Sequence, residues 1–163
     1  MSIIAKTYCD TPLGTVEIAA TEQGISHLKW VEFPTYEIDP GNSLLIQCID
    51  QLTEYFEGNR THFTVFLDLQ GTDFQRKVWR EIMEIPLGKT ATYLEIARKV
   101  SSKDAVRAVG TACGANKHLM LVPCHRVVGT NGNLTGYAGG VSRKRKLLDH
   151  EWGVLFGKQG ELF

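Results

Sequence analysis

The sequence predicts an α+β protein with two domains, residues 1–70 and residues 71–163. The first thirty residues contain three β-rich runs that turn residues separate, and one amphipathic helix follows them. The second half contains short helices with capping-box starts and a glycine-rich loop. A chain of 163 residues is long enough for two small domains that each bury a core.

The first half is predicted to be a strand meander with one helix. Turn residues separate the β-rich runs, and the apolar residues of the helix recur at helical spacing until Gly58 ends it. The expected elements are strands at 3–8, 15–20 and 25–31, a loop at 33–42, a helix at 44–56 and a further strand at 63–69. Together they would form a small α+β unit.

The second half is predicted to be mainly helical. Thr72 and Thr92 each stand three residues before Gln or Glu, the spacing of a capping box, and Ser101 opens a third helix that ends near Gly114. The second and third helices are short and about four residues apart, which is typical of a helix-turn-helix but also of plain helical bundles. Beyond them the sequence predicts an extended segment at 118–128, a loop with five glycines at 129–140, and a last helix that Ser142 caps.

The net charge is zero, but the two halves differ in sign. Residues 1–70 carry three basic and ten acidic residues, a net charge of −7, while residues 71–163 carry 15 basic and 8 acidic residues, a net charge of +7. A basic domain attracts polyanions, so this division favours a second domain that binds nucleic acid. Two solvated surfaces of unlike charge are the alternative.

Composition also bears on the compartment and on metals. The chain has no run of about 18 apolar residues and no basic start followed by an apolar stretch, so it predicts neither a membrane span nor secretion and favours the cytoplasm. The four cysteines form no CxxC pair and are expected to be free thiols. No metal site is expected, because the scattered residues Cys9, His27, Cys48 and His62 lack the short spacing of zinc ligands.

The most informative segment is Leu121–Val128. In this apolar run the thiol of Cys124 is followed directly by the imidazole of His125 and the guanidinium of Arg126. Basic neighbours are expected to lower the pKa of Cys124 and to raise the fraction of thiolate, the nucleophilic form. Pro123 constrains the backbone before the thiol, and Glu151 is available to orient a histidine. A buried structural cysteine is the alternative.

The PCHRVV segment at 123–128 resembles the active-site signature of the O6-alkylguanine-DNA alkyltransferases. The resemblance is strong over residues 71–152, whereas the first domain agrees only in length and strand pattern. Its further motifs are Phe74-Gln75, Val78-Trp79, Gly88, Thr92-Tyr93, Ile96-Ala97, Ala105–Gly110, Asn116, Gly136–Gly140 and Leu147–Glu151. It implies a ribonuclease H-like first domain and a winged helix-turn-helix-like second domain. A non-catalytic sister group has another residue at the position of Cys124.

The resemblance implies a reaction in which the alkyl group on guanine O6 passes to a cysteine of the protein, once per molecule. Cys124 is the expected nucleophile and acceptor, His125 the base that acts through a bridging water, and Glu151 the residue that orients the imidazole. Tyr93 is expected to donate a proton to the departing purine, and Asn116 to brace the turn before the thiol.

The resemblance also implies a set of substrate-binding residues. A stacked base must be flipped out of the duplex to reach a buried thiol, and the helix that carries Arg107 is expected in the minor groove. From the residues alone, Tyr93 could instead pack at a helix start, Arg107 could be solvated, and Asn116 could cap a helix. The expected set is Arg107 in the space of the flipped base, the backbones of Cys124, Val127 and Ala138 at the base edge, Tyr137 as a wall and Lys144 near O6.

Two positions depart from the family pattern. Lys117 replaces the proline that follows the asparagine in many relatives, and Ala138 replaces a serine found in some. A backbone contact survives the change to alanine, but a hydroxyl contact does not, so the size of the accepted alkyl group stays open. The basic run Arg143–Lys146 at a helix start is expected to contact phosphates.

The sequence therefore predicts direct reversal of guanine alkylation in double-stranded DNA that contains alkylated guanine, with O4-alkylthymine as a second candidate substrate. No cofactor and no membrane are expected, and the free protein is expected to be a monomer. Two alternatives remain: a non-catalytic sensor that binds alkylated guanine, and a cysteine hydrolase that uses Cys124 and His125. Alkylation of the thiol separates them, because it occurs once in a transferase, never in a sensor, and with turnover in a hydrolase.

Overall fold

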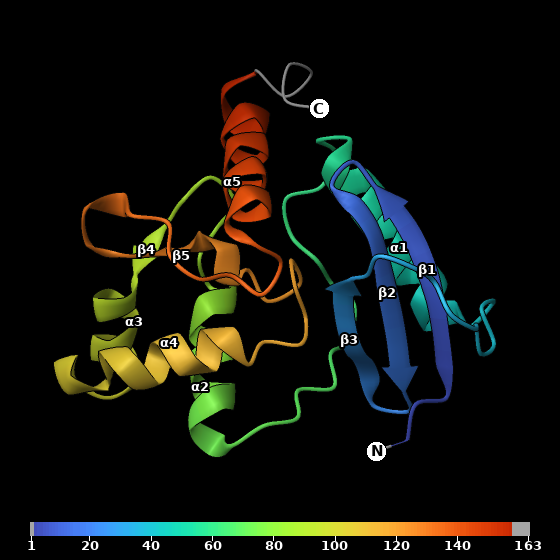
Figure 1. Cartoon of the computed structure of the whole chain (residues 1–163), viewed down its shortest axis with the longest axis horizontal. Coiled ribbons are helices and arrows are strands. Elements are labelled where there is room, and N and C mark those ends of the chain that lie inside the picture. Colours follow the sequence, from blue (N-terminus) through green and yellow to red (C-terminus); the bar gives the residue numbers. More distant parts are fainter. Residues whose placement is uncertain (1, 158–163) are drawn as a thin grey trace. The chain divides into compact units, whose positions relative to one another are not determined.

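The computed structural model describes residues 2–157 and divides into two compact units, residues 1–70 and 71–163 (Figure 1). The first unit is an antiparallel sheet with one helix, and the second is mainly helical. Within the described range, no helix is both long and apolar enough to cross a membrane. Each unit has a hydrophobic core of its own.

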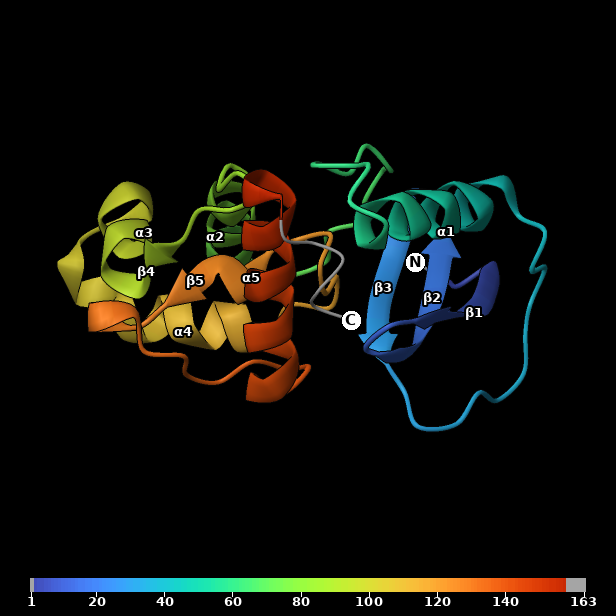
Figure 2. The same cartoon turned by 90° about the horizontal axis from the view of Figure 1, so that it is seen from above.

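Unit 1 is a three-stranded meander in the order β1-β2-β3, covered on one face by α1 (Figure 2). The alternation of side chains turns one face of each strand toward α1, where Ile18, Leu28 and Leu52 are buried. Asn42 starts α1 by accepting hydrogen bonds from the first free backbone N–H groups. The bounds are β1 (Ala5–Thr11), β2 (Gly14–Thr21), β3 (Gly24–Trp30) and α1 (Ser43–Phe56).

The expected strand at 63–69 is wrong. This segment forms only an isolated bridge, in which Phe66 O and the Asp68 N–H bond the backbone of Ile25 at 2.8 Å each. Pairing stops there because Asp68 turns toward Thr21, whose hydroxyl donates to its carboxylate at 2.7 Å. The backbone of Phe66 approaches Gly24 so closely that a Cβ on Gly24 would lie 2.6 Å from Phe66 O.

Unit 2 packs four α-helices around two short parallel strands, which pair Ala91 with Val127 and Thr92 with Val128. Helices α2 and α4 lie against each other (Figure 1), and the Trp79 indole donates to Ala112 O at 2.8 Å. The bounds are α2 (Asp73–Met83), β4 (Ala91–Thr92), α3 (Tyr93–Val100), the 3₁₀ turn η1 (Lys103–Ala105), α4 (Val106–Gly114), η2 (Cys124–Arg126), β5 (Val127–Val128), η3 (Thr130–Gly132) and α5 (Val141–Phe156).

The helix starts of unit 2 agree with the sequence in two cases and differ in two. Thr72 forms a complete capping box with Gln75, and the Thr92 hydroxyl accepts from the N–H of the third residue after it. The third helix begins one residue later than expected, because Ser102 rather than Ser101 caps η1, which leads into α4. The last helix starts before Ser142, because Gly140 at φ 91° takes a conformation that favours glycine and precedes the first turn.

The expectation of an extended segment over 118–128 is also wrong. The chain turns at Met120, which has φ 70°, and Leu119 then forms a bridge with Val122. Pro123 has no N–H to continue a ladder, and the next three residues form a 3₁₀ turn whose Arg126 N–H bonds Pro123 O at 2.9 Å. Cys124 therefore begins a tight turn instead of lying within a strand.

Candidate active site

Cys124 lies at the start of η2, directly after Pro123, with 4% of its surface exposed. Its N–H bonds Val122 O at 2.7 Å, which keeps the backbone before the thiol in a tight bend. The residues from Leu121 to Val128 are all buried. The thiol is therefore held inside unit 2 by an apolar segment.

Asn116 connects the end of α4 to the segment that carries the thiol. Its Nδ2 donates to Val122 O at 2.9 Å and its Oδ1 accepts from the His118 N–H at 2.8 Å. The side chain also forms a hydrogen bond with the Cys124 thiol, which acts to lower the pKa of that thiol. A buried amide with all these partners makes the bend before Cys124 a single defined conformation.

The residues after the thiol form a buried ionic cluster with α5. His125 Nε2 lies 2.6 Å from Glu151 Oε2, and Arg126 makes two bonds to the same carboxylate, at 2.8 and 3.0 Å. The Arg126 guanidinium also donates to Ile85 O at 2.7 Å. Burial alone would raise the pKa of Glu151, but the charges and hydrogen bonds of His125 and Arg126 hold it well below its usual range.

The expected effect of basic neighbours on Cys124 is wrong. The 3₁₀ turn points Arg126 at Glu151, so the guanidinium does not act on the thiol. A hydrogen bond with Cys113 and then burial raise the pKa of Cys124 well above its usual value, and Asn116 and Lys144 oppose the change only in part. A reaction in which the Cys124 thiol serves as a nucleophile therefore needs a base to take its proton.

His125 has one nitrogen directed to Glu151 and one available. Its Nδ1 is buried and makes no hydrogen bond with the residues that the structure describes. The ring meets Tyr137 edge to face, with centroids 6.3 Å apart. An imidazole oriented by a carboxylate, with a second nitrogen left to exchange a proton, is the arrangement of a general base.

A cavity of about 580 Å³ opens beside this cluster. Four of the expected site residues line it: Tyr93, Arg107, Tyr137 and Ala138. The other lining residues are small, Val106, Gly110, Thr111, Gly114, Thr135 and Gly136. The volume suits a flat ring system, and Arg107 lies exposed on α4 at the cavity wall.

Lys144 lies near Tyr93, which lines the cavity. Lys144 is buried, its ammonium donates to Thr135 O at 3.0 Å, and it lies 5.8 Å from the centre of the Tyr93 ring. The Tyr93 hydroxyl accepts from the Thr135 hydroxyl at 3.4 Å, and burial raises its pKa. Burial lowers the pKa of Lys144, while the nearby sulfurs of Cys113 and Cys124 oppose that shift.

The structure places all ten expected residues in unit 2, and four of them line the cavity. Cys124, His125 and Glu151 are buried, Val127 is buried on β5, and Arg107 and Ala138 are exposed. Sequence reasoning missed Cys113, because nothing in a helix sequence shows which buried side chain will meet a distant thiol. It also missed Thr135, whose hydroxyl and carbonyl bond Tyr93 and Lys144.

The structure gives no alternative site for a metal in the described range. No group of three or more His, Cys, Asp or Glu side chains converges among residues 2–157. Cys9 and Cys48 lie in unit 1 as free thiols, and His27 bonds Glu17 instead of a cysteine.

Known proteins match both units. Residues 73–153 match the DNA binding domain of 6-O-methylguanine DNA methyltransferase, and residues 4–69 match its ribonuclease-like domain. The methylated-DNA–protein-cysteine methyltransferase of Mycobacterium bovis is 45% identical over 149 residues, which cover 87% of this chain and 88% of the relative. The inducible Bacillus subtilis protein of that name is 50% identical over 119 residues, which cover 69% of this chain and 66% of the relative.

A solved structure agrees with these matches. The crystal structure of Mycobacterium tuberculosis OGT in complex with DNA has a TM-score of 0.83 and 43% identity, and covers 90% of this chain and 92% of that one. The expected α+β fold, with a small ribonuclease-like sheet domain before a helical domain, is confirmed. The chain belongs to the 6-O-methylguanine DNA methyltransferase family.

Proposed function

We propose that this protein repairs DNA by removing the alkyl group from O6 of guanine and transferring it to Cys124. The names of its relatives describe a methyl transfer from methylated DNA to a cysteine of the protein itself. One observation supports Cys124 as that cysteine. Among the four free thiols, Cys124 is the one adjacent in sequence to His125, which bonds the buried carboxylate of Glu151.

The reaction is a displacement at a saturated carbon. His125, oriented by Glu151, takes the thiol proton of Cys124 through a bridging water. The sulfur attacks the alkyl carbon, the new S–C bond forms as the C–O6 bond breaks, and the electron pair passes to the purine. Tyr93 donates a proton to the departing guanine. A thioether does not hydrolyse, so each protein molecule acts once.

The cavity is the proposed binding site for the flipped base. Tyr137 serves as a wall, and Lys144 lies near the O6 edge. The backbones of Cys124, Val127 and Ala138 contact the remaining polar edge, while Arg107 fills the space that the base leaves in the duplex. Exposed Ala108 and half-buried Gly110 on α4 support this assignment, because small side chains allow close approach to DNA.

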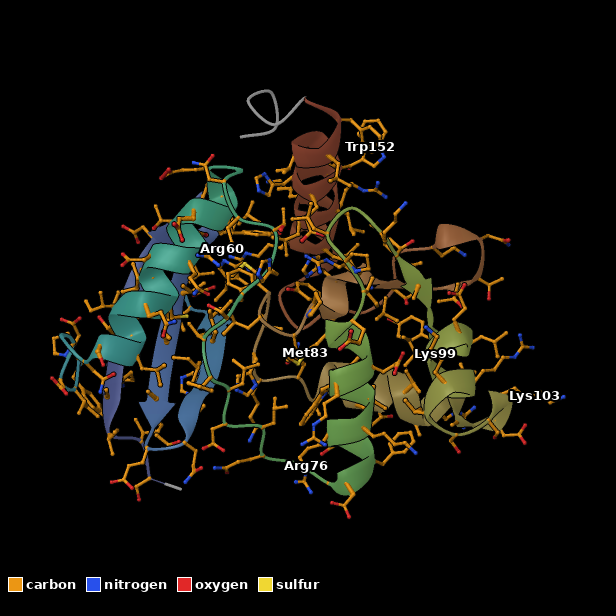
Figure 3. The ribbon with its side chains drawn as sticks, turned by 180° about the vertical axis from the view of Figure 1, so that it is seen from behind. Arg60, Arg76, Met83, Lys99, Lys103 and Trp152 are labelled. Carbon is orange, nitrogen blue, oxygen red and sulfur yellow. The ribbon has the colours of Figure 1, made fainter. Side chains whose placement is uncertain are left out.

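The two units have different proposed roles. Residues 71–163 bind double-stranded DNA through a helix-turn-helix formed by α3 and α4, with α4 in the minor groove. Their positive charge supports this, and exposed Lys103 in η1, between the two helices, extends outward (Figure 3). Residues 1–70 support that unit. The free protein acts as a monomer in the cytoplasm.

Mass spectrometry of the intact protein tests the function directly. After incubation with a methylguanine oligonucleotide, the protein is expected to gain one methyl group, and peptide mapping is expected to find it on Cys124. The Cys124→Ser variant is expected to lose transfer and keep DNA affinity, because a hydroxyl is a far weaker nucleophile at neutral pH. Binding without any mass gain would identify a sensor, and a methyl on Cys9, Cys48 or Cys113 would overturn the assignment.

A further inference from the structure

Thr135, in the glycine-rich loop at 129–140, contacts two residues of the proposed site. Its hydroxyl donates to the Tyr93 hydroxyl at 3.4 Å, and its carbonyl accepts from the Lys144 ammonium at 3.0 Å. Thr135 and Tyr93 both line the cavity. The two hydroxyls come from residues 42 positions apart in the sequence, so their contact is a product of the fold.

Backbone hydrogen bonds hold the loop around Thr135. Before this residue, the Gly129 N–H bonds Asn133 O at 2.8 Å. At Thr135 itself, the ammonium of the buried Lys144 side chain bonds the carbonyl. These bonds place the Thr135 peptide without any contribution from its side chain. The bond from its hydroxyl to Tyr93 can therefore be removed without removing the contacts that hold the loop.

The side chain of Thr135 has a defined direction within this loop. A Cβ added to Gly129 would lie 3.9 Å from the Thr135 Cγ2, so the methyl group lies beside the start of the loop. Branching at Cβ restricts the side-chain torsion of threonine to a few rotamers. With the methyl group beside Gly129, the hydroxyl is directed to Tyr93.

The hydrogen bond limits where the Tyr93 proton can point. A phenol hydroxyl carries one proton and also accepts at its oxygen, and the proton prefers the plane of the ring, in which it has two positions. Because the Thr135 hydroxyl donates to this oxygen, it occupies one of these directions. The Tyr93 proton takes the other and remains available for transfer.

We propose that Thr135 is a positioning residue, whose hydroxyl holds the Tyr93 phenol in the orientation that donates a proton to the departing guanine. As the C–O6 bond breaks, the Tyr93 O–H bond breaks and the proton forms a bond to the purine. The phenolate left behind accepts from the Thr135 hydroxyl, which itself gives up no proton. This role rests on the proposed function, because it concerns the step in which guanine leaves.

The acidity of Tyr93 agrees with this role. Burial raises the pKa of the phenol, and the hydrogen bond from Thr135 opposes that rise. A donor to the phenol oxygen favours the charged form, so it makes the buried tyrosine a stronger acid than it is without that donor. The same contact thus orients the proton and assists its departure.

Single-turnover transfer by the full-length protein tests the proposal, with a methylguanine duplex at saturating concentration. Thr135→Val keeps the shape of the side chain and loses the hydroxyl, and it is expected to slow transfer about fivefold, the effect of one hydrogen bond, with unchanged DNA affinity. Thr135→Ser keeps the hydroxyl and should transfer within about twofold of the parental rate. Thr130→Val, which changes an exposed threonine of η3 in the same loop, is the matched control and should transfer at the parental rate.

A double variant separates the positioning of Tyr93 from a general effect on the loop. In a protein that already carries Tyr93→Phe, the change Thr135→Val is expected to slow transfer no further, because no phenol proton remains to be positioned. Slowing by the same factor with and without the Tyr93 hydroxyl would overturn the proposal. So would a Thr135→Val protein that transfers at the parental rate.

Carbon NMR of protein labelled at the tyrosine Cζ gives a second measurement that needs no transfer. The resonance missing from Tyr93→Phe identifies Tyr93, and its titration midpoint is expected at higher pH in Thr135→Val than in Thr135→Ser or the parent, since the donor is lost. Equal midpoints in a parent that transfers methyl groups would overturn only the role of Thr135. A shifted midpoint in a parent that transfers none would keep the hydrogen bond and overturn the proposed function together with the role that rests on it.

Discussion

Each unit buries a glutamate that binds a histidine, and the surroundings of the two pairs differ. In unit 1, Glu17 bonds His27 at 2.7 Å and the Tyr8 hydroxyl at 2.8 Å, with Lys29 at 3.7 Å and Lys6 at 4.0 Å. In unit 2, Glu151 bonds His125 and Arg126, and the peptide that carries the histidine also carries the Cys124 thiol.

The neighbours of each pair indicate what the pair does. Around Glu17 they hold the loop after β3: the Tyr8 hydroxyl lies 2.7 Å from the Thr35 hydroxyl, and Lys6 lies 3.7 Å from the Tyr36 ring. Around Glu151 they hold the turn of Cys124, the proposed nucleophile, and His125 contacts Tyr137, which lines the cavity. A buried carboxylate–histidine pair is therefore not evidence of catalysis by itself, and the Cys124 thiol next to His125 in the sequence distinguishes the two cases.

The largest expected effect tests this distinction directly. Glu151→Gln is expected to slow methyl transfer on the order of 10³-fold, because His125 loses the carboxylate that orients it and stabilises its charged form. Glu17→Gln, the matched change in unit 1, should alter the rate by about twofold or less. Single-turnover rates of both folded variants measure this. Equal slowing would mean that Glu151 has only a structural role.

Removal of Arg126 is expected to act on stability. Arg126→Ala leaves Glu151 with less compensation and should cost about 3–5 kcal/mol in the free energy of unfolding, against about 1 kcal/mol or less for Lys6→Ala. Because the folded pKa of Glu151 is depressed, its stabilising effect is present above its unfolded value of 4.5 and is lost as the pH falls below it.

Urea unfolding at neutral pH and at about pH 4 and below measures both effects of Arg126→Ala. The variant should be less stable at neutral pH and should lose less stability on acidification than the parent, since its Glu151 pKa lies closer to the unfolded value. A parallel pH dependence in the two proteins would show that Arg126 does not set the ionisation of Glu151.

Tyr93 and Tyr8, both half-buried, offer a comparison of the same kind. Tyr93→Phe is expected to slow transfer on the order of 10²-fold, because the departing purine loses its proton donor. Tyr8→Phe removes a hydroxyl that bonds Glu17 and should leave the rate unchanged while costing about 1 kcal/mol of stability. If Tyr93→Phe transfers at the parental rate, its hydroxyl is not the proton donor.

Arg107→Ala should separate base flipping from chemistry. On duplex DNA we expect transfer to slow on the order of tenfold, because the extrahelical base loses its substitute in the stack. On free methylguanine, which needs no flipping, the rate should stay nearly unchanged. Equal slowing on both substrates would assign Arg107 to the wall of the cavity.

The smallest expected effect concerns the charge of the two units. Lys146→Ala removes an exposed cation of unit 2 and should lower the slope of log affinity against log salt by about one unit for every sequence. Lys29→Ala in unit 1 should leave that slope unchanged. Titrations of both variants with a fluorescent duplex at several salt concentrations measure it, and a change for Lys29→Ala would place DNA contacts in unit 1.

Local patterns in the sequence predicted the regular elements well. The three strands, α1 and the capping box at Thr72 depend on neighbours within a few residues, so periodicity and cap chemistry identify them. The expected strand at 63–69 failed because its pairing depends on Gly24 and Thr21, which lie more than forty residues earlier. The 3₁₀ turn at Cys124 was not predicted, because the residues around Pro123 are β-rich while the proline itself ends the strand pairing.

Site residues could be predicted from the sequence where they belong to a recognisable motif. PCHRVV and the end of α5 gave His125 and Glu151, which the structure brings to 2.6 Å. The orientation of Arg126 and the approach of Cys113 depend on tertiary packing, and no spacing rule contains them. The direction of the Cys124 pKa was wrong for the same reason, because adjacency in sequence does not make Arg126 a neighbour of the thiol in space.

The contacts of Arg126 also affect how unit 2 unfolds on heating. Its guanidinium bonds Ile85 O after α2 and the carboxylate of α5, while its backbone belongs to the turn at Cys124. A side chain shared by three segments couples their opening, so amide hydrogens of the turn should exchange with solvent only when unit 2 unfolds as a whole. Repair competence would then disappear in one step on warming, at the melting of unit 2, without an earlier phase in which a folded protein has a disordered site.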